Sequence, residues 1–259
     1  MKKLFVIFAA ALLSSAFLVS CNHDDGYSVG NFVVAWGTVD TTANGQMFAI
    51  RRDNGSTLFV QNSRVPASEF VAGQRVIVNY TILSSDNSTP RNYNVSVNSL
   101  FQVLTKDYLL RSFIDEDTTG VRADSIGNDP VTVNRAWFGD RFINIDFSAR
   151  FGNTVQHLIT LVRDDVDTPD DTVRLYLHHN AFGDPQLFSA RGYVAFDIAS
   201  VVPAGQGSVP VKLIWTDFGG NESSDSGTFT WPRTSATTPT GEPSYRSESM
   251  PDMAAPRMR

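Results

Sequence analysis

Residues 75–82 have the sequence RVIVNYTI. Val76, Val78, Tyr80 and Ile82 alternate with other residues, and Ile77 is the one apolar residue that interrupts the alternation. A period of two is typical of a β-strand that packs one face on a core and turns the other to solvent. The stretch therefore predicts an antiparallel strand, and the same pattern recurs along most of the chain.

The first part of the chain predicts a small barrel. Asn54-Gly55 lies between two apolar stretches and indicates a tight hairpin. Residues 66–70 allow one helical turn before the stretch at 75–82. Five strands with one helical turn between the third and the fourth are typical of an OB-like barrel. The five expected strands are Phe32–Val39, Met47–Arg52, Thr57–Gln61, Arg75–Ile82 and Tyr93–Leu104.

The second part predicts a β-sandwich. Between Val131 and Trp231 we expect about seven short strands, separated by turn residues. In one of them Ile143, Ile145 and Phe147 alternate with polar residues. The chain is thus expected to be all-β, with an OB-like barrel at 31–105 and a sandwich at 106–232. Lys106 to Phe113 could form two helical turns, and 233–259, rich in Thr, Ser, Pro and Met, is expected to be a disordered tail.

Charge argues against nucleic acid as a partner. The chain carries a formal charge of −6, and binding to nucleic acid depends on neutralising phosphates. The excess is uneven, because Tyr27 to Thr105 is net +1 and Lys106 to Trp231 is net −8. The change near Thr105 is a candidate domain boundary. In the barrel region, the only local support for a basic nucleic-acid-binding groove comes from Arg51, Arg52 and Arg75.

Most large aromatic side chains are expected in the two cores. An OB barrel that binds single strands needs stacking aromatics beside a basic groove, whereas buried aromatics need only apolar neighbours. We expect core positions for Trp36, Tyr80 and Phe101 in the barrel and for Trp137, Trp215 and Trp231 in the sandwich.

The N-terminus predicts an export signal. Lys2 and Lys3 precede an uncharged apolar run, Leu4–Val19, which is too short to cross a bilayer as a helix. Residues 1–20 are therefore expected to be a signal peptide. The run ends in the sequence LVSC, which resembles the lipobox of Gram-negative lipoproteins, and Cys21 is the only cysteine of the chain. The resemblance implies a diacylglyceryl thioether on Cys21 and acylation of the new amine, for example with palmitate.

A short acidic leader, residues 21–30, follows the cysteine. Asn22, His23, Asp24 and Asp25 resemble a signal that sends lipoproteins to the outer surface of some Gram-negative cells. We therefore expect a lipid-anchored protein of the outer membrane that is exposed at the cell surface. The alternative is a solvated leader that only holds the fold away from the membrane.

Three segments resemble the NigD-like lipoprotein family: residues 21–32, residues 71–82 and residues 140–147. The resemblance implies an N-terminal OB-like domain and a C-terminal β-sandwich. The family takes its name from a gene in a bacteriocin operon, which implies an immunity or accessory role. It supplies no catalytic residues.

Two groups of polar residues contain side chains that can bind metals. The densest acidic cluster is a weak candidate for Ca²⁺, which prefers hard oxygen ligands; the alternative is a solvated connection between two strands. His178 and His179 are adjacent, so in a strand they point to opposite faces and cannot share one metal. We expect no metal and no cofactor. The acidic cluster consists of Asp164, Asp165, Asp167, Asp170 and Asp171.

Four short triplets begin with Asp followed by Ser or Thr and resemble an acceptor motif for O-glycosylation. Their acceptor hydroxyls belong to Thr41, Thr118, Ser125 and Thr172.

The sequence favours a non-enzymatic binding or accessory lipoprotein with a protein or glycan partner. No Gly-x-Ser-x-Gly motif and no phosphate-binding glycine loop occurs. Two alternatives stay open: a bacteriocin immunity or envelope-protection lipoprotein, and a surface hydrolase that would use some of the many carboxylates.

Overall fold

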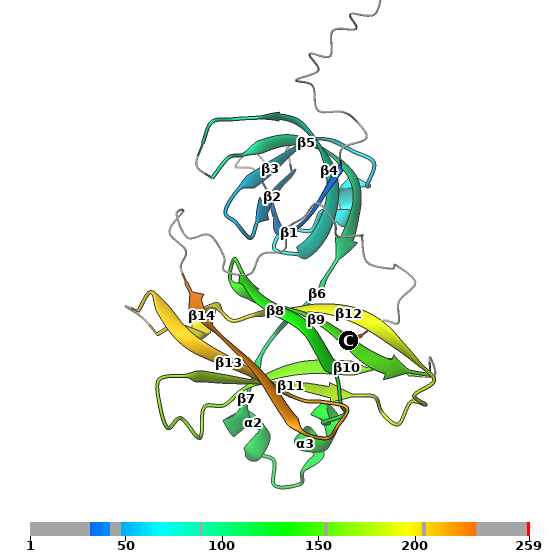
Figure 1. Cartoon of the computed structure of the whole chain (residues 1–259), viewed down its shortest axis with the longest axis vertical. Helices are drawn as coiled ribbons and strands as arrows, with labels where there is room; N and C mark the ends of the chain where they lie inside the picture. Colours follow the sequence, from blue (N-terminus) through cyan, green and yellow to red (C-terminus); the bar gives the residue numbers. More distant parts are fainter. Residues whose placement is uncertain (1–31, 42–47, 89, 153–154, 204–205, 232–257) are drawn as a thin grey trace, which may run out of the picture.

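The chain folds into a β-barrel followed by a β-sandwich, placed one above the other along the long axis (Figure 1). The structure is a computed structural model. It describes residues 32–41, 48–88, 90–152, 155–203, 206–231 and 258–259. The signal peptide, Cys21 and the acidic leader lie outside the described residues.

The barrel has five strands that close in the order β1-β2-β3-β5-β4. β3 and β5 pair in parallel and the other pairs are antiparallel. The hairpin at Asn54-Gly55 is confirmed: it joins β2 to β3, and Gly55 has a φ of 85°, a region that favours glycine. The elements are β1 (Phe32–Thr41), β2 (Phe48–Arg52), β3 (Thr57–Ser63), the 3-10 turn η1 (Ala67–Glu69), β4 (Arg75–Ser85) and β5 (Tyr93–Gln102).

The alternation at 75–82 explains how β4 serves the barrel. Val76, Val78 and Tyr80 point into the barrel core. Phe70, just after η1, stacks on Phe48 with ring centroids 4.8 Å apart and joins the same core. Ile77 faces outward and is nevertheless buried, because the second domain covers this side of the barrel.

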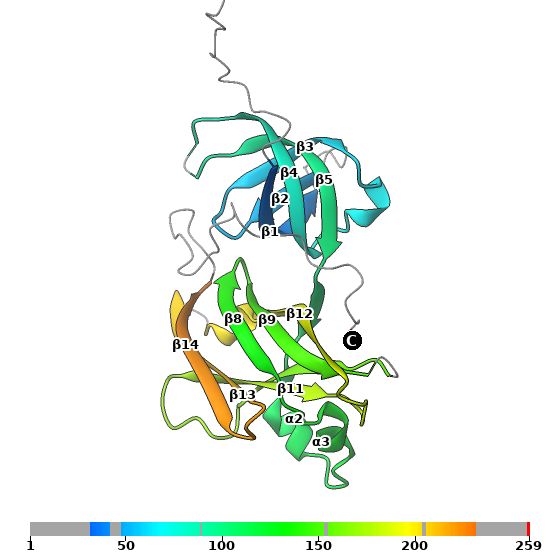
Figure 2. The ribbon, with the colours of Figure 1, turned by 45° about the vertical axis from the view of Figure 1, so that its right-hand side comes forward.

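The sandwich consists of a four-stranded sheet, β6-β12-β9-β8, and a five-stranded sheet, β14-β13-β11-β10-β7. The four-stranded sheet lies next to the barrel (Figures 1 and 2). Its strands are β6 (Leu104–Asp107), β8 (Thr132–Gly139), β9 (Phe142–Phe151) and β12 (Phe188–Asp197). The other sheet has β7 (Leu109–Leu110), β10 (Leu158–Arg163), β11 (Val173–Asn180), β13 (Ser208–Thr216) and β14 (Glu222–Thr230).

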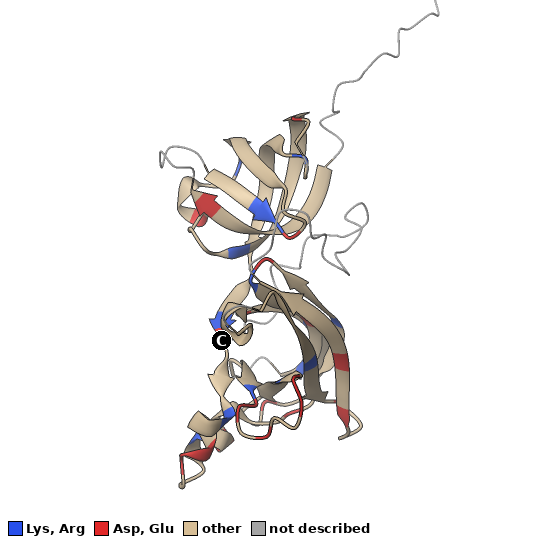
Figure 3. Cartoon of the chain, turned by 90° about the vertical axis from the view of Figure 1, so that its left-hand side faces the viewer, with Lys and Arg blue, Asp and Glu red and all other residues tan. Residues whose placement is uncertain are grey.

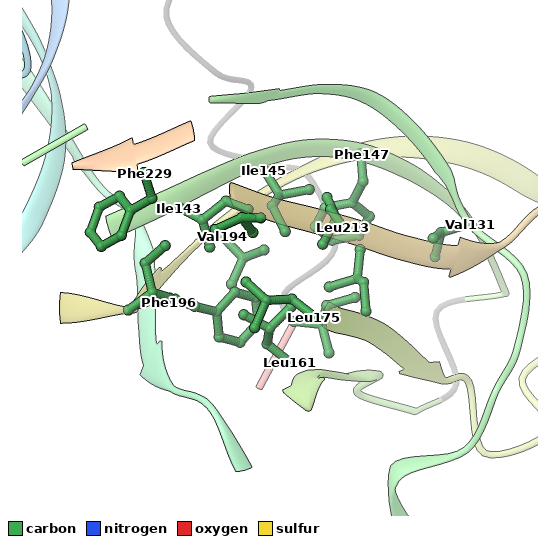
Figure 4. Packing of buried hydrophobic residues seen from close by; sticks show 14 of the residues in the cluster. Val131, Ile143, Ile145, Phe147, Leu161, Leu175, Val194, Phe196, Leu213 and Phe229 are labelled. Carbon is green, nitrogen blue, oxygen red and sulfur yellow. The ribbon is translucent and has the colours of Figure 1, made fainter. Parts of the chain in front are cut away.

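Inward side chains of the two sheets form the sandwich core. Ile143, Ile145 and Phe147 of β9 meet Leu161, Leu175 and Leu213 of the other sheet (Figure 4). Each such side chain contributes on the order of 1.5–3 kcal/mol when fully buried. The seven strands expected after Val131 are β8 to β14.

The start of the second part differs from the sequence-based expectation in two respects. Thr105 lies inside β6, which pairs with β12, so the sandwich begins at Leu104. Within Lys106–Phe113, four residues lie in strands and the last three begin a helix. The helices are α2 (Arg111–Asp115) and α3 (Val121–Ile126), held on β10 by Ile114 and Ile126, with a further turn, η2 (Ala199–Val201).

Of the tail expected to be disordered over 233–259, the structure describes Met258 and Arg259. Met258 forms a parallel bridge with His157. Main-chain hydrogen bonds at the edge of a sheet, together with a partly buried Met258, hold this segment. Residues 232–257 lie outside the described part of the chain.

Candidate binding cleft at the domain junction

An apolar cluster joins the two domains. Trp36 of β1 meets Trp137 of β8 edge to face, with ring centroids 4.8 Å apart and planes at 90°. Ile77 on the barrel side and Phe142 on the sandwich side extend the contact. Trp36 and Trp137 were expected in the separate cores, and both are instead buried at the junction, because each lies on an outward face that the other domain covers.

A buried ion pair lies beside this cluster. The Arg75 guanidinium donates to Asp53 through two nitrogens, Nη1 to Oδ1 at 2.7 Å and Nη2 to Oδ2 at 2.9 Å. Both side chains are fully buried. Arg75 Nη2 also donates to Asn144 Oδ1 on β9 at 2.8 Å, and Trp137 Nε1 donates to Asp53 Oδ2 at 3.3 Å. The ion pair therefore belongs to the barrel, and its remaining hydrogen bonds reach across to the sandwich.

A second ion pair crosses the junction nearer to solvent. Arg51 Nη2 donates to Asp140 Oδ2 at 3.1 Å, and Thr38 Oγ1 donates to the same oxygen at 3.2 Å. Asp140 has a φ of 53°, a left-handed conformation that Asp tolerates better than most residues. Together the two pairs fix the orientation of the barrel on the sheet.

A cleft of about 210 Å³ opens at the edge of this junction. Trp36 of β1 forms one wall, and the outward side chains of β8, β9 and β12 form the rest. The lining residues are Trp36, Asn134, Arg135, Trp137, Asp146, Arg191 and Tyr193.

The polar groups of the cleft hold one another in place. Arg191 forms a bidentate ion pair with Asp146, with Nε 2.7 Å from Oδ1. Asn134 Nδ2 donates to the same carboxylate at 3.0 Å. The Arg191 side chain is 58 % exposed while that of Asp146 is 5 % exposed, so the cation faces the opening and the carboxylate lies beneath it.

Aromatic rings complete the cleft. The Arg191 guanidinium lies 5.3 Å from the Tyr193 ring centroid, and that of Arg135 lies 5.4 Å from the Trp137 ring. Such contacts orient the guanidinium groups at the cleft. The cleft thus offers two cationic groups and aromatic edges around a single carboxylate, a set suited to binding an anionic or hydroxyl-rich ligand.

The sequence patterns did not predict this cleft. They indicate that Asp146 lies on the polar face of β9, but they give that face no role. The sequence feature that could have indicated the cleft is the polar face of β9, together with Arg135 and Trp137, which lie close to β9 along the chain. Which domain surface covers that face cannot be read from the alternation.

The basic residues proposed as support for a nucleic-acid groove have structural roles. Arg75 is fully buried and Arg52 is 9 % exposed, and Arg51 binds Asp40 and Asp140. Figure 3 shows basic and acidic segments interspersed over both domains. Among the described residues, the barrel therefore presents no stripe of free arginines.

Intramolecular contacts occupy the acidic cluster. Asp164 accepts hydrogen bonds from the backbone of Val166 and Asp167 and from Arg111. Burial raises the pKa of Asp164, but these hydrogen bonds outweigh it and the net pKa is lowered. Asp165 binds Ser112, and Asp170 binds Arg174. Within the described part of the chain, no group of three or more His, Cys, Asp or Glu side chains is placed to hold a metal ion, and Asp171 belongs to no such group.

The four candidate acceptor hydroxyls lie in different places. Thr41 ends β1, and Thr118 lies between α2 and α3; both are exposed. Ser125 is exposed on α3, where its hydroxyl donates to Arg122 O at 2.8 Å. Thr172 is half-buried just before β11. O-glycosylation at these residues stays a prediction.

The adjacent histidines point to opposite faces, as expected. His178 Nδ1 lies 2.9 Å from Gly127 O. His179 is buried in the sandwich, where His157 Nδ1 lies 3.0 Å from its Nε2. His157 Nε2 in turn lies 3.1 Å from Asp184 Oδ2. This chain of groups is enclosed at the end of the core, away from the cleft.

Both domains match known family patterns. Residues 36–103 match the NigD-like N-terminal OB domain, and residues 113–229 match the NigD-like C-terminal β-sandwich domain. No curated protein matches the chain. In the described residues, no helix is both long and apolar enough to cross a bilayer.

Solved structures share the two-domain fold. A toxin-related protein from Parabacteroides distasonis is 27 % identical, with a TM-score of 0.65, over 78 % of this chain and 95 % of that one. A protein of unknown function (DUF1344) from Bacteroides vulgatus is 25 % identical, with a TM-score of 0.61, over 79 % and 92 %. A NigD-like immunity protein from Bacteroides caccae is 20 % identical, with a TM-score of 0.56, over 79 % and 99 %, which shows the fold alone. Because both of its domains match the family patterns and the solved structures share its architecture, the chain belongs to the NigD-like family.

Proposed function

We propose that this protein is a lipid-anchored binding protein of the cell envelope, and that the cleft at the domain junction holds part of a protein or glycan partner. One observation carries the proposal. The cleft is lined by side chains of regular strands that ion pairs, hydrogen bonds and ring contacts already fix. A preorganised site loses little side-chain entropy when a ligand binds.

The chemistry of the lining supports recognition. Arginine and the large aromatic residues contribute most of the energy at many binding interfaces. Arg135 and Arg191 can donate to carboxylate, sulfate or hydroxyl oxygens, and Tyr193 offers an amphipathic ring. A saccharide carrying an acidic group, or an acidic loop of a protein, matches this set.

The same lining favours binding over hydrolysis. Glycoside hydrolysis by the common mechanisms needs two carboxylates on opposite sides of the bond. Asp146 is the one carboxylate among the lining residues, and Arg191 and Asn134 engage it. We therefore propose a non-enzymatic role for the cleft.

The anchor part of the proposal rests on the sequence. The apolar run Leu4–Val19 and the sequence LVSC support lipidation of Cys21. Residues 22–25 support export to the outer surface. Two or more acyl chains would hold the protein firmly on the membrane, so a partner would be met at the cell envelope.

Site-specific photo-crosslinking in living cells tests the cleft. A photoreactive residue replaces Asn134, at the rim of the cleft, and the matched control replaces Ser226, exposed on β14. We expect a discrete adduct from position 134 that position 226 does not form. The adduct should weaken when Arg191→Ala is added. Equal labelling at both positions, or none, would contradict the proposal.

Protease treatment of intact cells tests the surface location. Loss of the protein, with a periplasmic protein left intact as the leakage control, is the expected result. Protection in intact cells, with digestion only after lysis, would place the protein inside the outer membrane and remove the surface reading of residues 22–25.

An immunity role is a second proposal. The names of two similar structures, a toxin-related protein and a NigD-like immunity protein, favour it. Deleting the gene should then sensitise the cells to a toxin that they or their neighbours release. Unchanged survival against every co-produced toxin would refute this role.

A further inference from the structure

The outer edge of β10 is covered by two short segments from distant parts of the chain. β7 pairs in parallel with the last residues of β10, at Val162 and Arg163. Met258 pairs in parallel with His157, just before the start of β10. The two segments thus follow one another along a single edge. Without them the edge would present unpaired N–H and C=O groups, which readily accept another strand.

Main-chain hydrogen bonds hold the Met258–Arg259 segment. Ile159 N–H donates to Arg259 O at 3.1 Å, and Arg259 N–H donates to His157 O at 3.0 Å. Gln156 Nε2 adds a hydrogen bond to Met258 O at 3.3 Å. The two main-chain hydrogen bonds depend on an extended backbone and not on particular side chains.

Two side-chain contacts add selectivity. Met258 packs against the sandwich core. The Arg259 guanidinium lies 5.0 Å from the ring centroid of Phe182. Phe182 is 42 % exposed and has a φ of 51°, a conformation that a bulky residue rarely adopts. The fold therefore keeps this ring on the surface, beside the segment, against its local preference.

Lys106 completes the edge between the two segments. Its ammonium donates to Ile159 O at 2.7 Å, from a half-buried position on β6. Burial lowers the pKa of Lys106, and the nearby charge of Arg259 lowers it further. The edge therefore offers main-chain hydrogen bonds, apolar core side chains that contact Met258 and a ring that accepts a cation.

We propose that this edge of β10 is an acceptor site for an extended peptide of a partner protein, which carries a long apolar residue followed by a cationic one. Met258 and Arg259 are its resident ligand. In the described part of the chain this segment contributes two residues to the edge, and a longer partner strand would form more main-chain hydrogen bonds than these two residues do. Adding a strand to an exposed edge is a common mode of peptide recognition. This site is separate from the junction cleft and does not depend on it.

The test compares the full chain with its Met258→Asp variant. The probe is a fluorescent peptide with the sequence of residues 250–259. We expect saturable binding to Met258→Asp and at least about tenfold weaker binding to the unchanged chain, because a tethered segment competes at an effective concentration near the millimolar range. A peptide with Asp in place of its penultimate Met should bind neither protein.

Hydrogen exchange at Ile159 provides the second readout. Its amide should exchange slowly in the unchanged chain, quickly in Met258→Asp and slowly again when the peptide is added. Arg259→Asp, at an exposed position, gives a milder variant with intermediate exchange if Met258→Asp fails to fold.

Either of two results overturns the proposal. One is a folded Met258→Asp protein that does not bind the peptide. The other is equally fast exchange at Ile159 in all variants. A concentration-dependent dimer that Met258→Asp abolishes would identify a second copy of this chain as the donor and refute the partner-protein assignment.

Discussion

Replacing Asp53 by alanine should strongly destabilise the domain junction. The substitution removes the acceptor of two Arg75 hydrogen bonds and of the Trp137 indole N–H. The Arg75 guanidinium would keep its charge in a site with no solvent exposure. Thr38 and Asn144 would remain as its hydrogen-bond partners, and neither carries a negative charge.

The magnitude follows from this burial. Removing one partner of a buried ion pair costs about 3–5 kcal/mol. A typical domain is stable by about 5–15 kcal/mol, so the loss is a large part of the total. Asp40→Ala is the matched control, because Asp40 pairs with Arg51 at 3.3 Å while both side chains are about half exposed. Its loss should cost less than about 1 kcal/mol.

Urea unfolding of the full chain, followed by tryptophan fluorescence, measures the difference. With a dependence of about 1–3 kcal/mol per molar urea, a loss of about 3–5 kcal/mol should lower the Asp53→Ala midpoint by about 1–5 M. Asp53→Leu combined with Arg75→Met should be more stable than Asp53→Ala, since apolar residues often replace a buried pair without loss. A change for Asp53→Ala as small as that for Asp40→Ala would refute the reasoning.

Further predictions concern packing, pH and anchoring. A Cβ on Gly139 would lie 2.1 Å from Asp53 Oδ2, whereas a Cβ on Gly207 would meet nothing within 4 Å. In the same urea assay, Gly139→Ala should therefore lower the free energy of unfolding by about 1–3 kcal/mol. Gly207→Ala should leave it unchanged. Burial, and then the charge of His157, lower the pKa of His179 from 6.5 to about 4. Between pH 6.5 and pH 4 the unfolded chain binds a proton at this position that the folded chain does not. The free energy of unfolding should therefore be highest above pH 6.5 and fall by about 3 kcal/mol towards pH 4. Urea midpoints that do not change between pH 7.5 and 4.5 would contradict this prediction. Cys21→Ser should release the protein from washed membranes, and retention in the pellet would count against lipidation.

The sequence alone predicted the architecture, an OB-like barrel followed by a β-sandwich. Alternation at residues 75–82 and in the other strands indicated half-buried β-strands, because a strand turns successive side chains to opposite faces. The hairpin at Asn54-Gly55 and the single turn near Ala67–Glu69 followed from local turn chemistry. These features depend on neighbouring residues only. Short helices such as α3 were missed, since their burial rests on a few contacts with β10.

The contacts between the two domains could not be predicted from the alternation of residues. Ile77 broke the alternation of β4, and Trp36 was assigned to the barrel core. Both residues face outward and are buried by the second domain. The partners of Arg75, namely Asp53, Thr38 and Asn144, are 22, 37 and 69 residues away in the sequence, and no local pattern connects them.

The sequence by itself therefore determined which residues of each strand share a face, and with them the barrel, the sandwich and the expected lipid anchor. Only the tertiary structure decided what covers those faces. Asn144 and Asp146 lie on the polar side of β9, yet both are buried, one under the barrel and the other in the cleft. The physical reason is that a period of two depends on the backbone alone, whereas the burial of an outward face depends on the domain that packs against it.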